Sequence, residues 1–155
     1  MPSDRALSRG SSALGARGLR VLGKLNVPLY RLSRGRLFGK VGRAPVLLLT
    51  TTGRRSGEPR TAPVLYHRDG ERIVVIGSNA GNERPPAWAL NLEANPECQV
   101  EVGARRSDAR ARIAQGEERE RLWQAMSDRF GGFEYYRERT DRDIKVFVLE
   151  SISAR

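Results

Sequence analysis

The fold of this chain is decided by residues 45–65, PVLLLTTTGRRSGEPRTAPVL. Two apolar, β-branched runs, 46–52 and 61–67, lie on either side of a segment that contains two glycines and a proline. Such runs are typical of short strands, and glycine and proline favour a bend between them. The stretch therefore predicts two neighbouring strands joined by a loop, which would begin an antiparallel meander.

Further strands and helices are indicated on the C-terminal side of this stretch. The residues 72–77, 98–102, 109–114 and 145–149 have the apolar or alternating character of strands, whereas 87–95, 116–130 and 133–139 favour helices. This count gives about six strands and two to four helices. It favours a small closed or partly closed β-barrel with flanking helices over a sandwich.

The chain length of 155 residues suits one domain with an N-terminal extension. We expect a flexible leader at 1–18, a basic amphipathic segment at 19–40 and the barrel at 41–155. The amphipathic segment would pack on the barrel or lie on an anionic membrane surface. No run approaches the roughly 18 to 20 apolar residues of a membrane span, so we expect a cytoplasmic protein, or one attached peripherally to the inner face of the cell membrane.

The charge balance favours anionic partners. Lysine and arginine number 28 against 18 acidic residues, a formal net charge of +10. Phosphates, polycarboxylates, nucleic acid and membrane surfaces are all compatible with it, and so is the codon bias of a GC-rich genome. The chain has one cysteine, Cys98, and one histidine, His67, so we expect no metal centre built from these residues.

Local placement of arginine is more informative than the total. Arg54, Arg55 and Arg60 surround the bend that contains Gly53 and Gly57. Exposed backbone amides in such a turn form an anion-binding nest, to which guanidinium groups add charge-assisted hydrogen bonds. The spacing is not that of a phosphate-binding GxxxxGK[ST] loop. A solvated basic hairpin would give the same pattern, so the residues alone leave both interpretations open.

Several motifs, in order, resemble the deazaflavin-dependent nitroreductase family. They lie at residues 45–60, 63–66, 86–92, 94–96, 116–119, 139–142 and 148–150, and the resemblance covers nearly all of residues 40–150. It implies a mainly β member of the α+β class, a six-stranded antiparallel split β-barrel of the kind that binds FMN. It also implies the coenzyme F420, a deazaflavin whose tail carries a phosphate and a string of glutamates.

The resemblance also implies a set of site residues. The coenzyme would be bound by Thr52, Gly53, Arg54, Arg55, Ser56, Gly57, Arg60, Pro63, Leu65, Ser78, Asn79, Ala80, Gly81, Trp88 and Asn91. The substrate would be bound by Phe130, Phe133 and Tyr136. A structural role competes with these roles for Trp88, which is an ordinary core residue by type, and for Phe130 and Phe133, whose spacing suits helix packing.

The implied activity is a reductase in which reduced deazaflavin, F420H2, gives a hydride to a planar apolar acceptor: a quinone, an activated alkene or a nitroaromatic. The proton would come from solvent or from Tyr136, the candidate catalytic residue, and we expect no side chain to be an obligatory nucleophile. Asn79 replaces a residue that is often basic in the family. The resemblance places Phe130 and Phe133 at positions where the nitroimidazole-activating member of the family has tyrosine. Two hydroxyl groups are therefore missing in this chain.

Two rival functions remain. A basic barrel that binds nucleic acid would suit the net charge, although aromatic residues make up only 6% of the chain and stacking platforms require them. An FMN-dependent enzyme on the same barrel is the second rival. The sequence leaves a monomer and a homodimer equally open.

Overall fold

The structure, a computed structural model, describes residues 27–37, 39–41 and 44–152. The predicted leader and the first part of the amphipathic segment lie outside the described residues. The elements in chain order are β1 (Lys40–Val41), β2 (Ala44–Thr52), β3 (Pro59–Leu65), β4 (His67–Asp69), β5 (Arg72–Ile76), the 3-10 helix η1 (Asn79–Gly81), α2 (Ala87–Ala94), β6 (Glu97–Val102), β7 (Arg105–Ile113), α3 (Gly116–Arg129), α4 (Gly132–Arg139) and β8 (Val146–Ser151).

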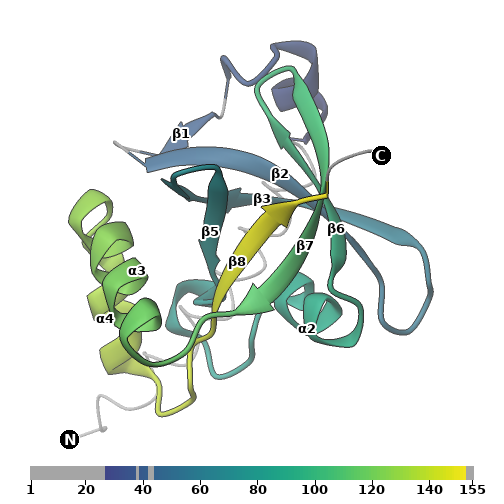
Figure 1. Ribbon diagram of the computed structural model, residues 1–155. Coiled ribbons are helices and arrows are strands. Elements are labelled where there is room, and N and C mark those ends of the chain that lie inside the picture. The colour runs from purple at the N-terminus through teal and green to yellow at the C-terminus, as the bar shows by residue number, and fades with distance from the viewer. Residues whose placement is uncertain (1–26, 38, 42–43, 153–155) are drawn as a thin grey trace, which may run out of the picture.

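The strands form one antiparallel sheet that curls into a partly open barrel with helices beside it (Figure 1). Their order is β1-β2-β6-β7-β8-β5-β4, and β3 pairs with β2 on its other side. β2 is therefore central: residues 46–52 pair with β3, and residues 48–51 pair with β6. This arrangement confirms the predicted antiparallel barrel with flanking helices.

The expected number of six strands is too low, because the described residues contain eight. One addition is β1, which has only two residues. The other arises because the predicted strand 61–67 divides at Tyr66. Up to Leu65 the chain pairs with β2, and from His67 it pairs with β5. A sequence pattern does not show this change of partner.

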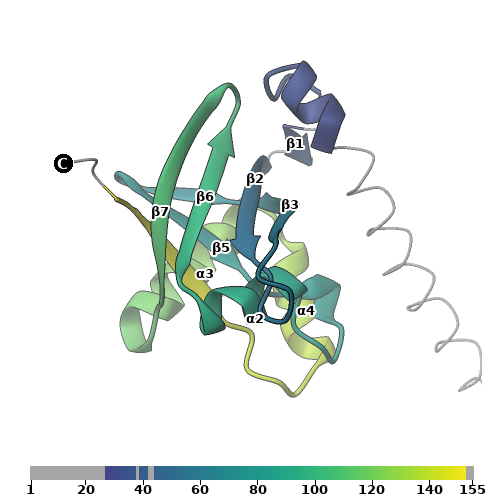
Figure 2. The same ribbon diagram turned by 90° about the vertical axis from the view of Figure 1, so that its right-hand side faces the viewer.

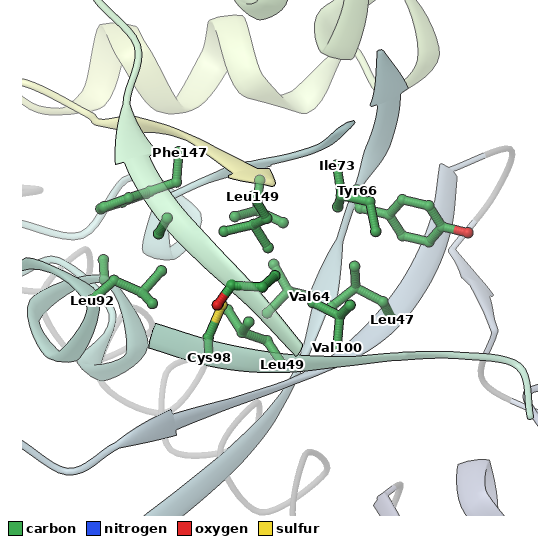
Figure 3. Packing of buried hydrophobic residues seen from close by; sticks show 14 residues of the cluster. Leu47, Leu49, Val64, Tyr66, Ile73, Leu92, Cys98, Val100, Phe147 and Leu149 are labelled. Atoms are coloured by element: carbon green, nitrogen blue, oxygen red, sulfur yellow. The ribbon is translucent and has the colours of Figure 1, made fainter. Parts of the chain in front are cut away.

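The interior of the barrel is filled by side chains that alternate along the strands (Figure 3). Leu47 and Leu49 of β2 meet Phe147 and Leu149 of β8 there, and Leu92 of α2 packs against the same cluster. Because successive side chains of a strand point to opposite faces, each strand gives only every second residue to this core.

β5 and β8 are buried on both faces. Their inward residues enter the barrel, whereas Val74 and Val148 pack with Trp123 and Met126 of α3 in a second apolar cluster on the outer face. A strand covered on both faces reads as a continuous apolar run. This explains the unbroken Ile73–Ile76 and Val146–Leu149 sequences.

Residues 27–32 are helical and attach to the barrel through Tyr30. Its side chain is 2% exposed. The hydroxyl oxygen lies 3.1 Å from the Val46 carbonyl oxygen and accepts a hydrogen bond from the Gly103 amide at 2.9 Å. Leu29, Leu32 and Leu37 of the same region are exposed. No helix in the described part of the chain is both long enough and apolar enough to span a bilayer.

Candidate functional site

The arginine loop, residues 53–60, joins β2 to β3 in a tight turn. The Gly53 amide donates to the Glu58 carbonyl at 2.8 Å, and the Gly57 amide donates to the Gly53 carbonyl at 2.8 Å. A Cβ atom on Gly53 would lie 2.6 Å from Ser56 Oγ, so only glycine fits there without a shift. Gly57 has a φ of +72°, which also favours glycine. The two glycines thus give the loop its fixed shape.

Most amides of this turn already have acceptors within the protein. Besides Gly53 and Gly57, the Arg54 amide donates to Asn91 Oδ1 and the Glu58 amide to Ser56 Oγ, each at 3.1 Å. In the described residues this leaves the Arg55 and Ser56 amides of the turn without a protein acceptor. The anion-binding nest expected from the sequence is therefore small, and recognition of an anion here depends mainly on the side chains.

The arginine side chains of the loop are open to solvent. Arg54, Arg55 and Arg60 are all exposed. Arg60 Nη2 lies 3.4 Å from Ser56 Oγ, and among the described residues none of the three forms an ion pair. Three cationic forks on a rigid turn, without bound carboxylates, can accept an anionic group with several oxygens.

Asn91 supports the loop from α2. It is 3% exposed, and its Nδ2 donates to Thr51 Oγ1 at 3.1 Å while its Oδ1 accepts from Arg54. Both polar atoms of its amide are occupied by the protein. The structure thus places Asn91, one of the residues that the resemblance assigned to coenzyme binding, beneath the arginine loop.

A second loop, residues 77–82, follows β5. Asn79 has a φ of +45° and its Nδ2 donates to the Arg84 carbonyl at 2.8 Å. Gly81 packs so tightly on α4 that a Cβ atom there would lie 3.1 Å from Tyr136 Cα. The predicted residues Ser78 to Gly81 and the predicted donor Tyr136 are therefore neighbours.

The aromatic side chains of α4 and the end of α3 form one cluster with β3. The rings of Phe130 and Tyr136 are half-buried, with centroids 6.4 Å apart, and they pack on the same apolar cluster as Leu65. Phe133 is 2% exposed and packs edge-on against Trp123. Phe130 and Tyr136 therefore form a partly open aromatic surface, Leu65 packs on the same apolar cluster, and Phe133 is buried within that cluster.

Two further predicted residues lie on strand β3 and helix α2. Pro63 is half-buried and faces Leu48 across the β2–β3 pair. Trp88 is half-buried, and its ring meets Phe147 edge-on with centroids 5.7 Å apart. Trp88 thus packs against the barrel interior with part of its surface left open.

The arginine loop, α2 and the 77–82 loop lie toward one end of the barrel (Figure 2). The arginine loop lies on one side of α2, and the 77–82 loop with α4 lies on the other, at the lower end in both Figures 1 and 2. Thr52 ends β2 where the arginine loop begins. The arrangement separates a cationic part of the site from an apolar, aromatic part.

An open hollow beside the arginine loop has a different character. It measures about 410 Å³ and is lined on the outer face of β2, β6 and β7 by residues that include Thr50, Gln99, Glu97 and Asp108. The two carboxylates would repel an anionic ligand. Thr52 and Pro59 also line the hollow, so it adjoins the arginine loop, but its carboxylates make it a poor site for an anion.

Sequence reasoning assigned no role to Arg142, which lies in the loop between α4 and β8. Its guanidinium donates to the carbonyl oxygens of Gly77, Ser78 and Asn82 at 3.1, 2.7 and 2.9 Å. The only sequence signal was its position in the Arg139–Arg142 motif.

Comparisons with known proteins identify the family of the chain. Residues 22–151 match the family model described as F420H(2)-dependent quinone reductase. An F420H(2)-dependent quinone reductase of Mycobacterium tuberculosis is 36% identical over 130 residues, which cover 81% of this chain and 87% of the relative.

Solved structures give the same result. A structure described as an F420-H2 dependent reductase, FDR-A, has a TM-score of 0.64 and 34% identity, covering 68% of this chain and 94% of its own. Another, described as a domain-swapped dimer, has a TM-score of 0.66 and 34% identity, with 77% and 90% covered. The match over most of the chain shows that this protein belongs to the F420H(2)-dependent quinone reductase family.

Proposed function

We propose that this chain is an oxidoreductase that uses F420H2 to reduce a quinone. The observation that carries the proposal is the arginine loop, whose three exposed guanidinium groups are free of carboxylate partners in the described residues. A phosphate and several glutamates are the kind of anion that such a loop would hold. The names of the relatives support the coenzyme and the acceptor.

The residues divide the work between the two parts of the site. Thr52 to Gly57 and Arg60 would hold the phosphate and glutamyl tail, with Asn91 fixing the loop from below. The ring would lie against Pro63, Leu65, Trp88 and the Ser78 to Gly81 backbone. When bound, F420H2 supplies a hydride from its C5, so the protein needs to position the ring and the acceptor and to exclude water.

We assign the acceptor to the open side of the aromatic surface. Phe130 and Tyr136 would contact a planar apolar molecule, and buried Phe133 would keep these rings in place. A quinone is the acceptor that we propose first, because it is planar and because the relatives carry its name. Activated alkenes and nitroaromatics are further acceptors of the same shape.

Titration of the purified protein with F420, FMN and a short oligonucleotide tests the coenzyme assignment. We expect saturable binding of F420 at micromolar concentration or below, no FMN binding, and no oligonucleotide binding that survives moderate salt. Reduction of a soluble quinone by F420H2 should then depend on the protein. If FMN bound in preference to F420, the chain would be a flavin enzyme on the same barrel.

We also propose that residues 27–37 bring the enzyme to an anionic membrane surface, where lipid-soluble quinones reside. Tyr30 is buried against the barrel, but Leu32 is 84% exposed, and the nearby Arg34 and Arg36 are also exposed. Exposed leucine with arginine is typical of interfacial segments. In sedimentation with anionic vesicles, wild type should pellet and the Leu32→Gln, Leu37→Gln double variant should not. Equal pelleting would contradict the proposal.

The oligomeric state is open between a monomer and a homodimer. One of the solved relatives is described as a domain-swapped dimer. We propose a homodimer for this chain, and sedimentation velocity at several protein concentrations tests it.

A further inference from the structure

Arg142 is bonded differently from the other arginines that the structure describes. Arg112 and Arg121, for example, bind carboxylates on neighbouring elements. Arg142 makes three hydrogen bonds, and all three acceptors are backbone carbonyl oxygens of the 77–82 loop. In the described residues no carboxylate oxygen lies within ion-pair distance of it. In the described residues, all hydrogen bonds of its guanidinium therefore go to this loop.

The three bonds span the loop from entry to exit. Nη1 and Nη2 bind the Gly77 and Ser78 carbonyls, at the point where the chain leaves β5, and Nε binds the Asn82 carbonyl after η1. A planar guanidinium fixes these three oxygens relative to one another, because its donors have a rigid geometry. An ammonium group in the same place could not reproduce that fork.

The loop requires such support. Asn79 and Gly81 both have positive φ, +45° and +74°. Asparagine tolerates left-handed backbone better than most residues with a side chain, and the bond from Asn79 Nδ2 to the Arg84 carbonyl supports it here, but the conformation still has a cost that contacts around the loop offset. Arg142 holds the loop on one side, and the close contact of Gly81 with the Tyr136 backbone holds it on the other.

Burial acts against the charge of Arg142. Desolvation lowers the pKa of its guanidinium, and neighbouring Asp143 opposes this change. An arginine nevertheless stays protonated at neutral pH. Burying part of a charged group costs free energy, and here the charge is bonded only to carbonyl oxygens of a loop. This cost indicates that the conformation of the loop matters to the protein.

We propose that Arg142 is a positioning residue for hydride transfer: its guanidinium sets the backbone of residues 77–82 against the deazaflavin ring. The inference rests on the proposed function, because that function assigns Ser78 to Gly81 to the ring. The tail of the coenzyme would be held by the arginine loop, on the other side of α2, which Arg142 does not contact. Arg142 should therefore govern the rate of the hydride step more than the affinity for the coenzyme.

The test compares Arg142→Lys and Arg142→Ala with the wild type. We expect the rate of hydride transfer from F420H2 to a soluble quinone to fall roughly 10- to 100-fold in both, because small misplacements of reacting groups have effects of this size. The dissociation constant for F420 should change less than about threefold. Guanidinium ion added to Arg142→Ala should restore part of the rate, and methylammonium at the same ionic strength should not.

The matched control is Arg119→Ala. Arg119 Nη2 also donates to a backbone carbonyl, that of Ile144 at 2.9 Å, in the loop that contains Arg142. It makes no hydrogen bond to the 77–82 loop in the described residues. Its loss should leave the hydride-transfer rate near that of wild type.

Three outcomes would overturn the inference. They are a wild-type rate in Arg142→Lys, a loss of coenzyme affinity and melting temperature in proportion to the loss of rate, and an absence of guanidinium-specific rescue. Wild-type protein that fails to bind F420 would instead refute the proposed function, and the inference with it.

Discussion

The arginines of the 53–60 loop carry the coenzyme assignment at the scale of single residues. Arg55 is exposed and its amide is one of the two in the turn without a protein acceptor. Replacement by alanine should weaken F420 binding roughly threefold to tenfold, since an exposed guanidinium contributes modestly in water. Binding measured by the fluorescence of the deazaflavin, at low and at high salt, checks this.

The control for Arg55→Ala is Arg105→Ala, which removes an arginine of β7 that is also exposed. It changes the net charge by the same amount. If both variants weakened F420 binding equally, the effect would be one of overall charge, and the loop would have no specific role.

Tyr136 is the residue to which the sequence assigned proton donation. Its half-buried ring lies beside Phe130, and its backbone packs on Gly81 of the 77–82 loop. If its hydroxyl donates the proton, Tyr136→Phe should lower the turnover of quinone at least about tenfold and leave F420 affinity unchanged. The neighbouring exposed Tyr135 provides the control, Tyr135→Phe. Unchanged turnover in Tyr136→Phe would remove the hydroxyl from the mechanism.

At the scale of elements, the link between α2 and the β2–β3 hairpin determines the shape of the arginine loop. Asn91→Ala would leave the Arg54 amide and the Thr51 hydroxyl without their buried partner. Loss of a buried hydrogen-bonding partner costs about 1 to 3 kcal/mol of stability. We expect a lower urea midpoint together with weaker F420 binding.

Asn95→Ala is the matched control for Asn91→Ala. Asn95 caps the end of the same helix and its Oδ1 accepts only the Glu97 amide, at an exposed position. Its loss should have a smaller effect on stability and none on the coenzyme. Retention of full F420 affinity in Asn91→Ala would show that the loop keeps its shape without α2.

The elements themselves follow closely from the sequence. The acidic first turn after Gly116 predicts the start of α3, and the apolar runs predict the strands. Besides β1 and the division between β3 and β4, β7 is an exception, because it begins at Arg105 and not at Ala109. Residues 105–108 are polar or charged, so no apolar alternation marks them as a strand, and only their pairing with β6 reveals it.

The site was predictable in its chemistry and less so in its supports. Glycines and arginines close together in sequence indicate an anion loop by themselves. The roles of Asn91 and Arg142 depend instead on backbone groups 37 and about 60 or more positions away along the chain. Spacing within a sequence contains no information on such contacts, so only the fold reveals them.

At the scale of the whole molecule, Glu101 joins the N-terminal segment to the barrel. This buried carboxylate of β6 accepts from Arg31 Nη2 at 3.0 Å and from Arg106 Nη2 at 2.9 Å. Burial raises its pKa, but the hydrogen bonds from the two arginines outweigh this and leave the pKa below its usual value near 4.5. The carboxylate therefore favours the folded state in its charged form.

A lowered pKa in the folded state fixes the pH dependence. The stabilisation is fully present above the unfolded-state value near 4.5 and is lost as the pH falls below it and Glu101 becomes protonated. Residues 27–37 should then become sensitive to proteolysis, and Glu101→Gln should show the same sensitivity at neutral pH. Glu97→Gln, on the exposed part of β6, is the control and should behave as wild type.

The central place of β2 has a consequence for the order in which the molecule opens. Strands bonded on both sides exchange their amide hydrogens only in the rarest fluctuations, whereas loops and edges exchange in frequent local ones. The arginine loop directly follows β2, which is paired with β3 and β6. The Val46 carbonyl of β2 also accepts a hydrogen bond from the Tyr30 hydroxyl. The anchor for an anionic tail is thus attached to the part of the protein that we expect to exchange last. We therefore expect the site for the anionic tail to keep its shape while the edge strands of the sheet fluctuate.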